Sequence, residues 1–228
     1  MHPRQIAVLA LVLAVSTVGC SPSVTGENTS PGHASPGGND VQVFAADLPF
    51  EQVRSKLRET DEQAIAQAIV QMAPMGDRQE VVQLLNAAWQ ESRAEYPDLN
   101  WELLAKPRAR VALAQVLGSW DRADPQFRSF ILEKVDAAKD FEKVETLIAL
   151  GAVALEADVP LLNGLARGPD ELAATGAMSG LQVADTKQAR QALTQIADDS
   201  TLPEGRRQLA RQLLSLPRAS DTNPNSVH

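Results

Sequence analysis

Helix-start signals recur along the chain from Pro49 onward, and this recurrence is the feature that most limits the possible folds. Capping boxes are expected at residues 60–63, 77–80 and 185–188, where an acid or hydroxyl is followed three residues later by Glu or Gln. Prolines that occupy an expected first helical position are Pro107, Pro125, Pro169 and Pro203. Asp124 is the expected cap before Pro125. The sequence therefore predicts an all-α protein of about ten short helices.

The apolar residues within these segments repeat with a helical period. One face is apolar at 65–72, at 189–196 and at 209–216, and no run of alternating β-branched residues predicts a strand. Each segment has a single apolar stripe and is too short to be stable alone in water. The helices are therefore expected to pack in pairs.

The turns suggest how these pairs are arranged. A helix rich in small residues, a brief turn and an aspartate recur at Asp77, Asp121, Asp158 and Asp185, at separations of 44, 37 and 27 residues. Irregular spacings of a two-helix unit are typical of helical repeat arrays.

Residues 158–200 resemble the short HEAT-like repeats, in which an apolar helix, Pro and Asp, a helix of small residues and a turn with Asp follow one another. The resemblance is close over 140–216 and looser over 60–140. It implies a right-handed αα-superhelix of about four to five helix pairs whose concave face binds proteins. The segment 96–106 breaks the period, and Gly176 and Gly180 inside a helix indicate close helix packing. A tetratricopeptide-like or irregular bundle is the alternative.

The amino-terminal end combines a basic residue, a short apolar run and a cysteine. Arg4 precedes an apolar or small run over residues 6–18, which is too short to span a bilayer and fits the core of a secretory signal. The run leads through Gly19 into Cys20, the only cysteine of the chain. This junction resembles that of bacterial lipoprotein precursors, although Thr17 stands where the family usually has an aliphatic residue.

The lipoprotein resemblance implies that Cys20 is diacylated and becomes the new amino terminus after cleavage. Two or three acyl chains would hold the chain durably on a membrane. Ser21 stands where the family places Asp for retention at the inner membrane, so the resemblance implies the outer membrane of a diderm bacterium, facing the periplasm. The alternative is an ordinary signal peptide that is cut near Gly19 and leaves a free thiol.

These observations divide the chain into four parts. Residues 1–19 are the expected lipoprotein signal peptide, and 20–44 are the lipidated cysteine with a flexible linker of Ser, Pro, Gly, Thr and Asn. Residues 45–217 are the expected helical repeat domain, and 218–228 are an expected disordered tail.

Composition excludes several functional classes. The net charge of −8 argues against nucleic acid as a partner. The three histidines, His2, His33 and His228, all lie outside the expected fold, which also lacks cysteine. This removes Ser-His and Cys-His nucleophile pairs and nearly all zinc sites, and we expect no catalytic residues, cofactor or metal site.

Candidate partner-binding residues come from two groups. Aromatic residues crowd between positions 89 and 120, and Asn100, Trp101 and Trp120 could form an exposed anchor there, or fill an irregular junction between repeats. Arg207 and Arg211 lie one helical turn apart and could clamp a carboxylate or phosphate, or pair with nearby acids.

Together these features predict a membrane-anchored, periplasm-facing lipoprotein that acts as a protein-binding adaptor or scaffold, with no enzymatic activity of its own. A small-ligand or peptidoglycan-binding module of the envelope is the alternative, and it would place Trp101 and Trp120 in one groove. A carboxylate-dependent hydrolase is a further alternative, and it would need a pocket with at least two acidic residues of raised pKa.

Overall fold

The computed structural model describes residues 49–216, and this part of the chain consists of helices joined by turns, with no strand. The all-α prediction is confirmed. The α-helices and the two 3-10 turns are α2 (Phe50–Lys56), α3 (Glu62–Gln71), η2 (Ala73–Met75), α4 (Gln79–Gln90), α5 (Trp101–Leu104), α6 (Pro107–Trp120), α7 (Pro125–Ala137), α8 (Asp140–Val153), η3 (Glu156–Asp158), α9 (Val159–Arg167), α10 (Glu171–Ala184), α11 (Lys187–Asp198) and α12 (Glu204–Ser215). The expected signal peptide, Cys20, the linker and the tail lie outside the described residues.

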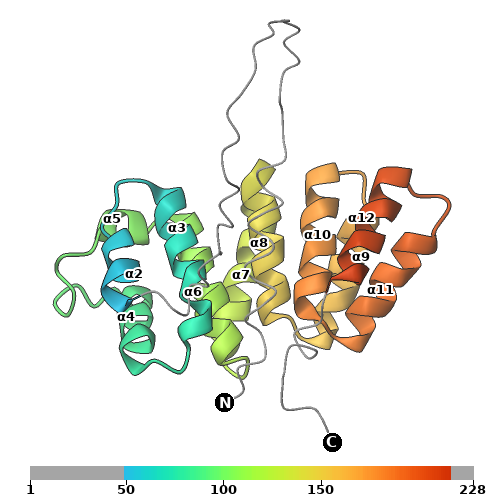
Figure 1. Ribbon diagram of the computed structural model, residues 1–228. Helices are drawn as coiled ribbons and strands as arrows, with labels where there is room; N and C mark the ends of the chain where they lie inside the picture. The colour runs from blue at the N-terminus through green and yellow to red at the C-terminus, as the bar shows by residue number, and fades with distance from the viewer. Residues whose placement is uncertain (1–48, 217–228) are drawn as a thin grey trace, which may run out of the picture.

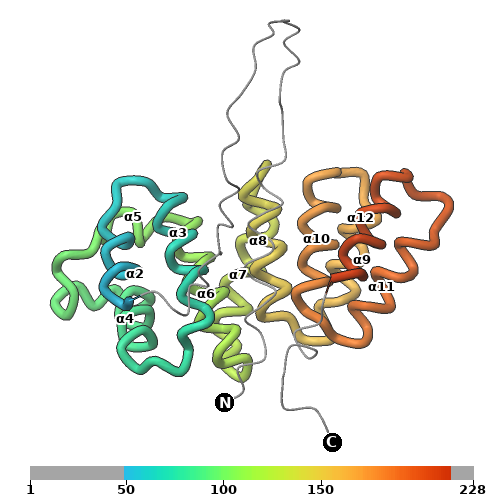
Figure 2. The backbone as a smooth tube through the Cα atoms, in the orientation of Figure 1, coloured from blue at the N-terminus to red at the C-terminus, as the bar shows by residue number. Residues whose placement is uncertain are grey.

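The helices succeed one another from α2 at one end of the molecule to α11 and α12 at the other (Figure 1). Helices α3, α6, α8, α10 and α12 each pack on the next in this series and form one continuous row. Helices α4, α7, α9 and α11 pack against this row, and the backbone trace shows how short turns join the two sets (Figure 2). None of the helices within residues 49–216 combines the length and apolar character that crossing a membrane requires.

Among the helices of residues 49–216, α8 and α10 share the most extensive contact, and glycines allow their close approach. A Cβ atom added to Gly151 would lie 2.2 Å from the carbonyl oxygen of Gly180, and one added to Gly180 would lie 2.5 Å from that of Leu147. At Gly176 the added atom would lie 2.8 Å from the Cα atom of Val144. The prediction that Gly176 and Gly180 serve close packing is confirmed, and Gly151 is the partner that the sequence did not reveal.

Several predicted helix starts are confirmed. Pro107 and Pro125 are the first residues of α6 and α7. Asp124 caps α7, since its carboxylate accepts a hydrogen bond of 2.9 Å from the backbone N–H of Gln126. The period break at 96–106 corresponds to α5, which has only 4 residues.

Other starts are wrong by one or two residues. The cap of α3 is Asp61 rather than Thr60, and that of α11 is Thr186 rather than Asp185. Asp185 has a positive φ of 46° and ends α10, so it cannot also begin α11. The remaining corrections concern residues just outside their helices: Arg78 rather than Asp77 precedes α4, Pro169 precedes the true cap Asp170, and Pro203 is itself a cap.

A buried ion pair fastens α7 to the turn between α8 and α9. Asp158 is only 3% exposed and accepts hydrogen bonds from the guanidinium of Arg128, with Nε at 2.7 Å, and from the backbone N–H of Leu155 at 2.8 Å. Burial, the largest single influence, raises the pKa of Asp158, but Arg128 and the Leu155 N–H together outweigh it and the pKa lies below its ordinary value. Asp158 is therefore a structural carboxylate.

Candidate binding groove

A groove of about 350 Å³ lies along α6, between α3 and α8. These three helices are successive members of the continuous row, so α6 forms the floor and its two neighbours form the walls. The apolar side chains of the lining are Ala66 and Val70 from α3, Val111 and Ala112 from α6, and Phe141, Val144 and Ile148 from α8. The groove is accordingly a largely apolar surface formed by three helices.

The amide of Gln115 interrupts this apolar surface. Gln115 is 6% exposed and stands in a run of α6 in which nearly every side chain is apolar and buried. It lines the groove, and among the described residues its amide has no hydrogen-bond partner. Gln63 and Gln67 add two further amides from the α3 wall. Gln115 is not among the described residues whose buried polar atoms lack a partner, so its amide opens into the groove, where a ligand could bond to it.

The charged end of the groove is built around Arg108. Its guanidinium holds Glu145 by two hydrogen bonds of 2.5 and 2.8 Å, and its backbone N–H donates to the carboxylate of Glu62 at 3.0 Å. The hydrogen bond with Glu145 is the main cause that raises the pKa of Arg108, and the negative charges of Glu62 and Glu142 add to it. Three carboxylates thus lie near one guanidinium, so acidic groups outnumber basic ones among these four side chains.

Phe141 lies at the edge of the groove, in the first turn of α8. Its side chain is 68% exposed, which makes it the most exposed large apolar residue of the described chain. Leu155 and Leu161 are the other two exposed large apolar residues, and they lie outside the groove. An exposed aromatic ring beside an apolar groove is typical of a binding surface.

The predicted residues Asn100 and Trp101 are placed in the junction before α6. Asn100 caps α5 through the N–H of Leu103 and donates its amide N–H to the carbonyl of Glu59 at 2.8 Å. Trp101 is 9% exposed, and its indole N–H donates to the carbonyl of Tyr96 at 2.9 Å. Both side chains have partners within the fold.

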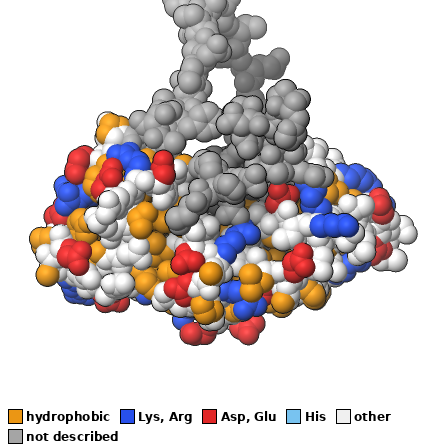
Figure 3. Space-filling view, turned by 90° about the horizontal axis from the view of Figure 1, so that it is seen from below, with side chains coloured by type: hydrophobic (Ala, Val, Ile, Leu, Met, Phe, Trp, Pro, Cys, Tyr) orange, Lys and Arg blue, Asp and Glu red, His pale blue; other side chains and the backbone are white. Residues whose placement is uncertain are grey.

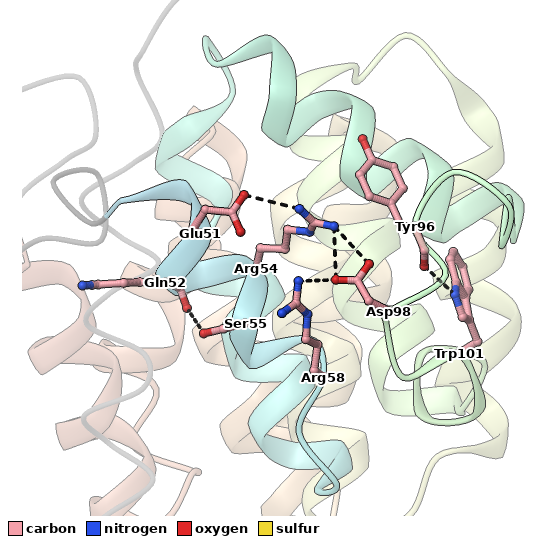
Figure 4. A network of polar contacts seen from close by, with 8 residues as sticks. All are labelled: Glu51, Gln52, Arg54, Ser55, Arg58, Tyr96, Asp98 and Trp101. Carbon is pink, nitrogen blue, oxygen red and sulfur yellow. Dashed lines mark hydrogen bonds and ion pairs between the residues drawn. The ribbon is translucent and has the colours of Figure 1, made fainter.

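Arg54 of α2 and Arg58, just after α2 ends, hold the same junction from the other side (Figure 4). Arg54 donates two hydrogen bonds of 3.0 and 3.1 Å to Asp98 and lies over the ring of Tyr96, while Arg58 forms a second ion pair with Asp98. The segment between α4 and α5 is therefore fastened to α2, and Asn100 and Trp101 belong to this structural network.

Trp120, at the end of α6, contacts the turn before α4. Its indole N–H donates to the carbonyl of Ala73 at 2.8 Å, and its ring lies so close to Gly76 that a Cβ atom there would be 2.6 Å from the indole nitrogen. The ring packs against the core and does not line the groove along α6. Trp101 and Trp120 therefore bond to two different turns of the chain.

Arg207 and Arg211 share a partner on their own helix. Both form ion pairs with Glu204 in the first turn of α12, and Arg211 also donates to the carbonyl of Ala197 at 3.1 Å. The two arginines that were predicted to bind a carboxylate or phosphate therefore both pair with Glu204 of their own helix.

The carboxylate of Asp199 also has partners within the fold. Asp199 accepts from the hydroxyl and the N–H of Thr201 and from Arg167, which lowers its pKa from 3.8 to about 2. Within residues 49–216, no three His, Cys, Asp or Glu residues come together as a metal site. Seen from one face, acidic and basic side chains are interspersed with apolar ones rather than gathered by sign (Figure 3).

The residues of the groove were not predicted as a site from the sequence. Gln115 could have been recognised as the one amide in an apolar helical run, and Phe141 as an aromatic residue in a charged first turn. What the sequence could not show is that α3 and α8, far apart in the chain, lie on either side of α6.

Comparison with known proteins adds no assignment to this geometry. No protein-family model matches the chain, and the searches of curated proteins and of solved structures found no significant match.

Proposed function

We propose that the chain is a membrane-anchored lipoprotein that holds a protein partner at the membrane through the groove of α3, α6 and α8. The observation that carries this proposal is the groove itself, a largely apolar surface with an exposed ring at its edge and the amide of Gln115 opening into it. The role requires no catalytic step and no cofactor.

We propose further that the helices form a right-handed αα-superhelix of HEAT-like pairs. The continuous row from α3 to α12, with the other helices packed against it, supports this arrangement. The adjacent helices α7 and α8, α9 and α10, and α11 and α12 also pack closely on one another. In such arrays one row provides an extended binding face, and the groove lies on the row of α3, α6 and α8.

The anchor is proposed from the sequence around Cys20, with attachment to the outer membrane and the fold facing the periplasm. The alternative of a peptidoglycan-binding or small-ligand module receives less support, since Trp101 and Trp120 bond to separate turns and neither lines the groove.

Replacement of the lipidation residue tests the anchor. Cys20→Ala is expected to abolish incorporation of labelled palmitate and to release the protein from the membrane fraction, because alanine has no thiol to acylate. Labelling of the variant equal to that of the wild type would contradict the anchor. Ser21→Ala is the matched control, and it is expected to leave labelling unchanged.

Site-specific crosslinking in cells tests the groove. A photoreactive phenylalanine analogue replaces Phe141, which is aromatic and exposed already, so the fold is not expected to suffer. The matched control carries the same analogue at Leu161, an exposed apolar position of α9 outside the groove. The expected result is a discrete protein adduct from position 141 that is absent from position 161. Equal adduct patterns at both positions would contradict the proposal.

A further inference from the structure

We propose that the groove binds an extended peptide segment of the partner, with apolar side chains followed by a lysine or arginine. This inference rests on the proposed function and specifies what the groove recognises. It is carried by three features of the lining: the amides, the apolar walls and the excess of carboxylates at one end.

The amides favour an extended backbone over other occupants. The Gln115 amide offers both a donor and an acceptor at a position that is 6% exposed, and it has no partner among the described residues. An extended peptide presents unpaired N–H and C=O groups that can satisfy both. A helix has already paired its backbone groups, and an acyl chain has none to offer. Gln63 and Gln67 can add bonds to neighbouring peptide groups from the wall.

The dimensions of the groove agree with a short peptide. The lining runs from residue 108 to 115 along α6, which at 1.5 Å per residue corresponds to about 10 Å. An extended chain covers that length with about three residues. The walls that Val70, Val111 and Ile148 contribute can receive apolar side chains from alternate positions.

The acidic end of the groove determines which peptide residue is favoured after the apolar ones. Glu62, Glu142 and Glu145 surround Arg108, and only one of the three charges is neutralised by it. A lysine or arginine of the peptide would find complementary charge there, whereas an acidic residue would be repelled.

A selection experiment tests the proposal directly. The full chain, lipidated and held in nanodiscs, is exposed to a phage-displayed library of short random peptides. The expected result is enrichment of sequences with apolar residues next to Lys or Arg. Failure to enrich any sequence, or enrichment of acidic sequences, would overturn the inference.

Two glutamine variants decide whether the Gln115 amide recognises the peptide. Gln115→Leu keeps the volume of the side chain and removes the amide, and it is expected to weaken binding of an enriched peptide by about tenfold, the effect of one lost hydrogen bond. The same variant is expected to leave the thermal midpoint of unfolding nearly unchanged, because the amide opens into the groove and makes no hydrogen bond within the fold. The control is Gln182→Leu on α10, at a residue 7% exposed and outside the groove, which should leave binding unchanged.

The outcomes separate this inference from the function on which it rests. A purely structural Gln115 would lower the thermal midpoint when replaced, with no specific effect on binding, and this would overturn the inference. An apolar ligand such as a fatty acid would bind the Gln115→Leu variant equally well or better, and fluorescent fatty acid binding of that kind without peptide binding would also overturn it. A discrete adduct at position 141 together with either result would leave the adaptor function standing and remove only the peptide.

Discussion

Gly151→Ala is expected to lower the free energy of unfolding by about 3 kcal/mol, toward the upper end of the usual range for overpacking. The added Cβ atom would lie 2.2 Å from the carbonyl oxygen of Gly180 and 2.6 Å from its Cα atom. Both obstacles are backbone atoms, so no side-chain rotation relieves the clash and α8 and α10 must separate. Chemical denaturation followed by circular dichroism measures the change.

Gly164→Ala is the matched control for this prediction. Gly164 lies inside α9, and a Cβ atom there meets no atom within 4 Å. The same substitution is therefore expected to raise stability by about 0.5–1 kcal/mol, because alanine is the better helix former. Equal effects at Gly151 and Gly164 would show that close contact between α8 and α10 is not what Gly151 provides.

Arg128→Met is expected to destabilise the fold by about 2 kcal/mol at neutral pH, less than the loss from a fully buried pair, because Asp158 is buried but the Arg128 side chain is 27% exposed. The substitution leaves the carboxylate of Asp158 buried with only the N–H of Leu155 to stabilise its charge. Urea denaturation at pH 7 measures the loss. The double variant Arg128→Met, Asp158→Asn removes the stranded charge and is expected to recover part of the stability.

The pH dependence provides a second measurement of the same pair. In the wild type the pKa of Asp158 lies below 3.8, so its contribution to stability is present above that pH and is lost as pH falls through the folded pKa. In the Arg128→Met variant only the N–H of Leu155 still opposes the effect of burial, so the pKa of Asp158 rises and protonation relieves the penalty. The difference between the two proteins should therefore be greatest near pH 7 and should shrink below about pH 4. A difference that stays constant across this range would contradict the ion-pair explanation.

The helical class of the fold could be predicted because it depends on local features. Asp124 with Pro125, and Pro107, begin helices where the sequence indicated. The errors at Thr60 and Asp185 arise where two acceptor side chains stand next to each other, because backbone dihedral angles decide which one becomes the cap. At Asp185 the positive φ that ends α10 assigns the next cap to Thr186.

The placement of side chains across helices was less predictable. Trp101 and Arg211 looked available as binding residues, yet each bonds to a carbonyl that is supplied by another turn or helix. Conversely, the groove depends on contacts of α6 with α3 and α8, which no local pattern encodes. The glycines show the same limit of local patterns. Gly180 could be recognised as a glycine inside a helix, but the role of Gly151 is visible only in the packing of α8 against α10.

The most direct test of the account combines crosslinking with fractionation of the envelope. The photoreactive analogue at position 141 is introduced into the wild type and into Cys20→Ala, and the adduct is followed in membrane and soluble fractions, with position 161 as the control. A membrane-held adaptor is expected to give one discrete adduct that is specific to position 141, found with the membrane in the wild type and released from it in Cys20→Ala. An adduct at neither position, or identical adducts at both, would contradict the claim that this groove holds a partner at the membrane.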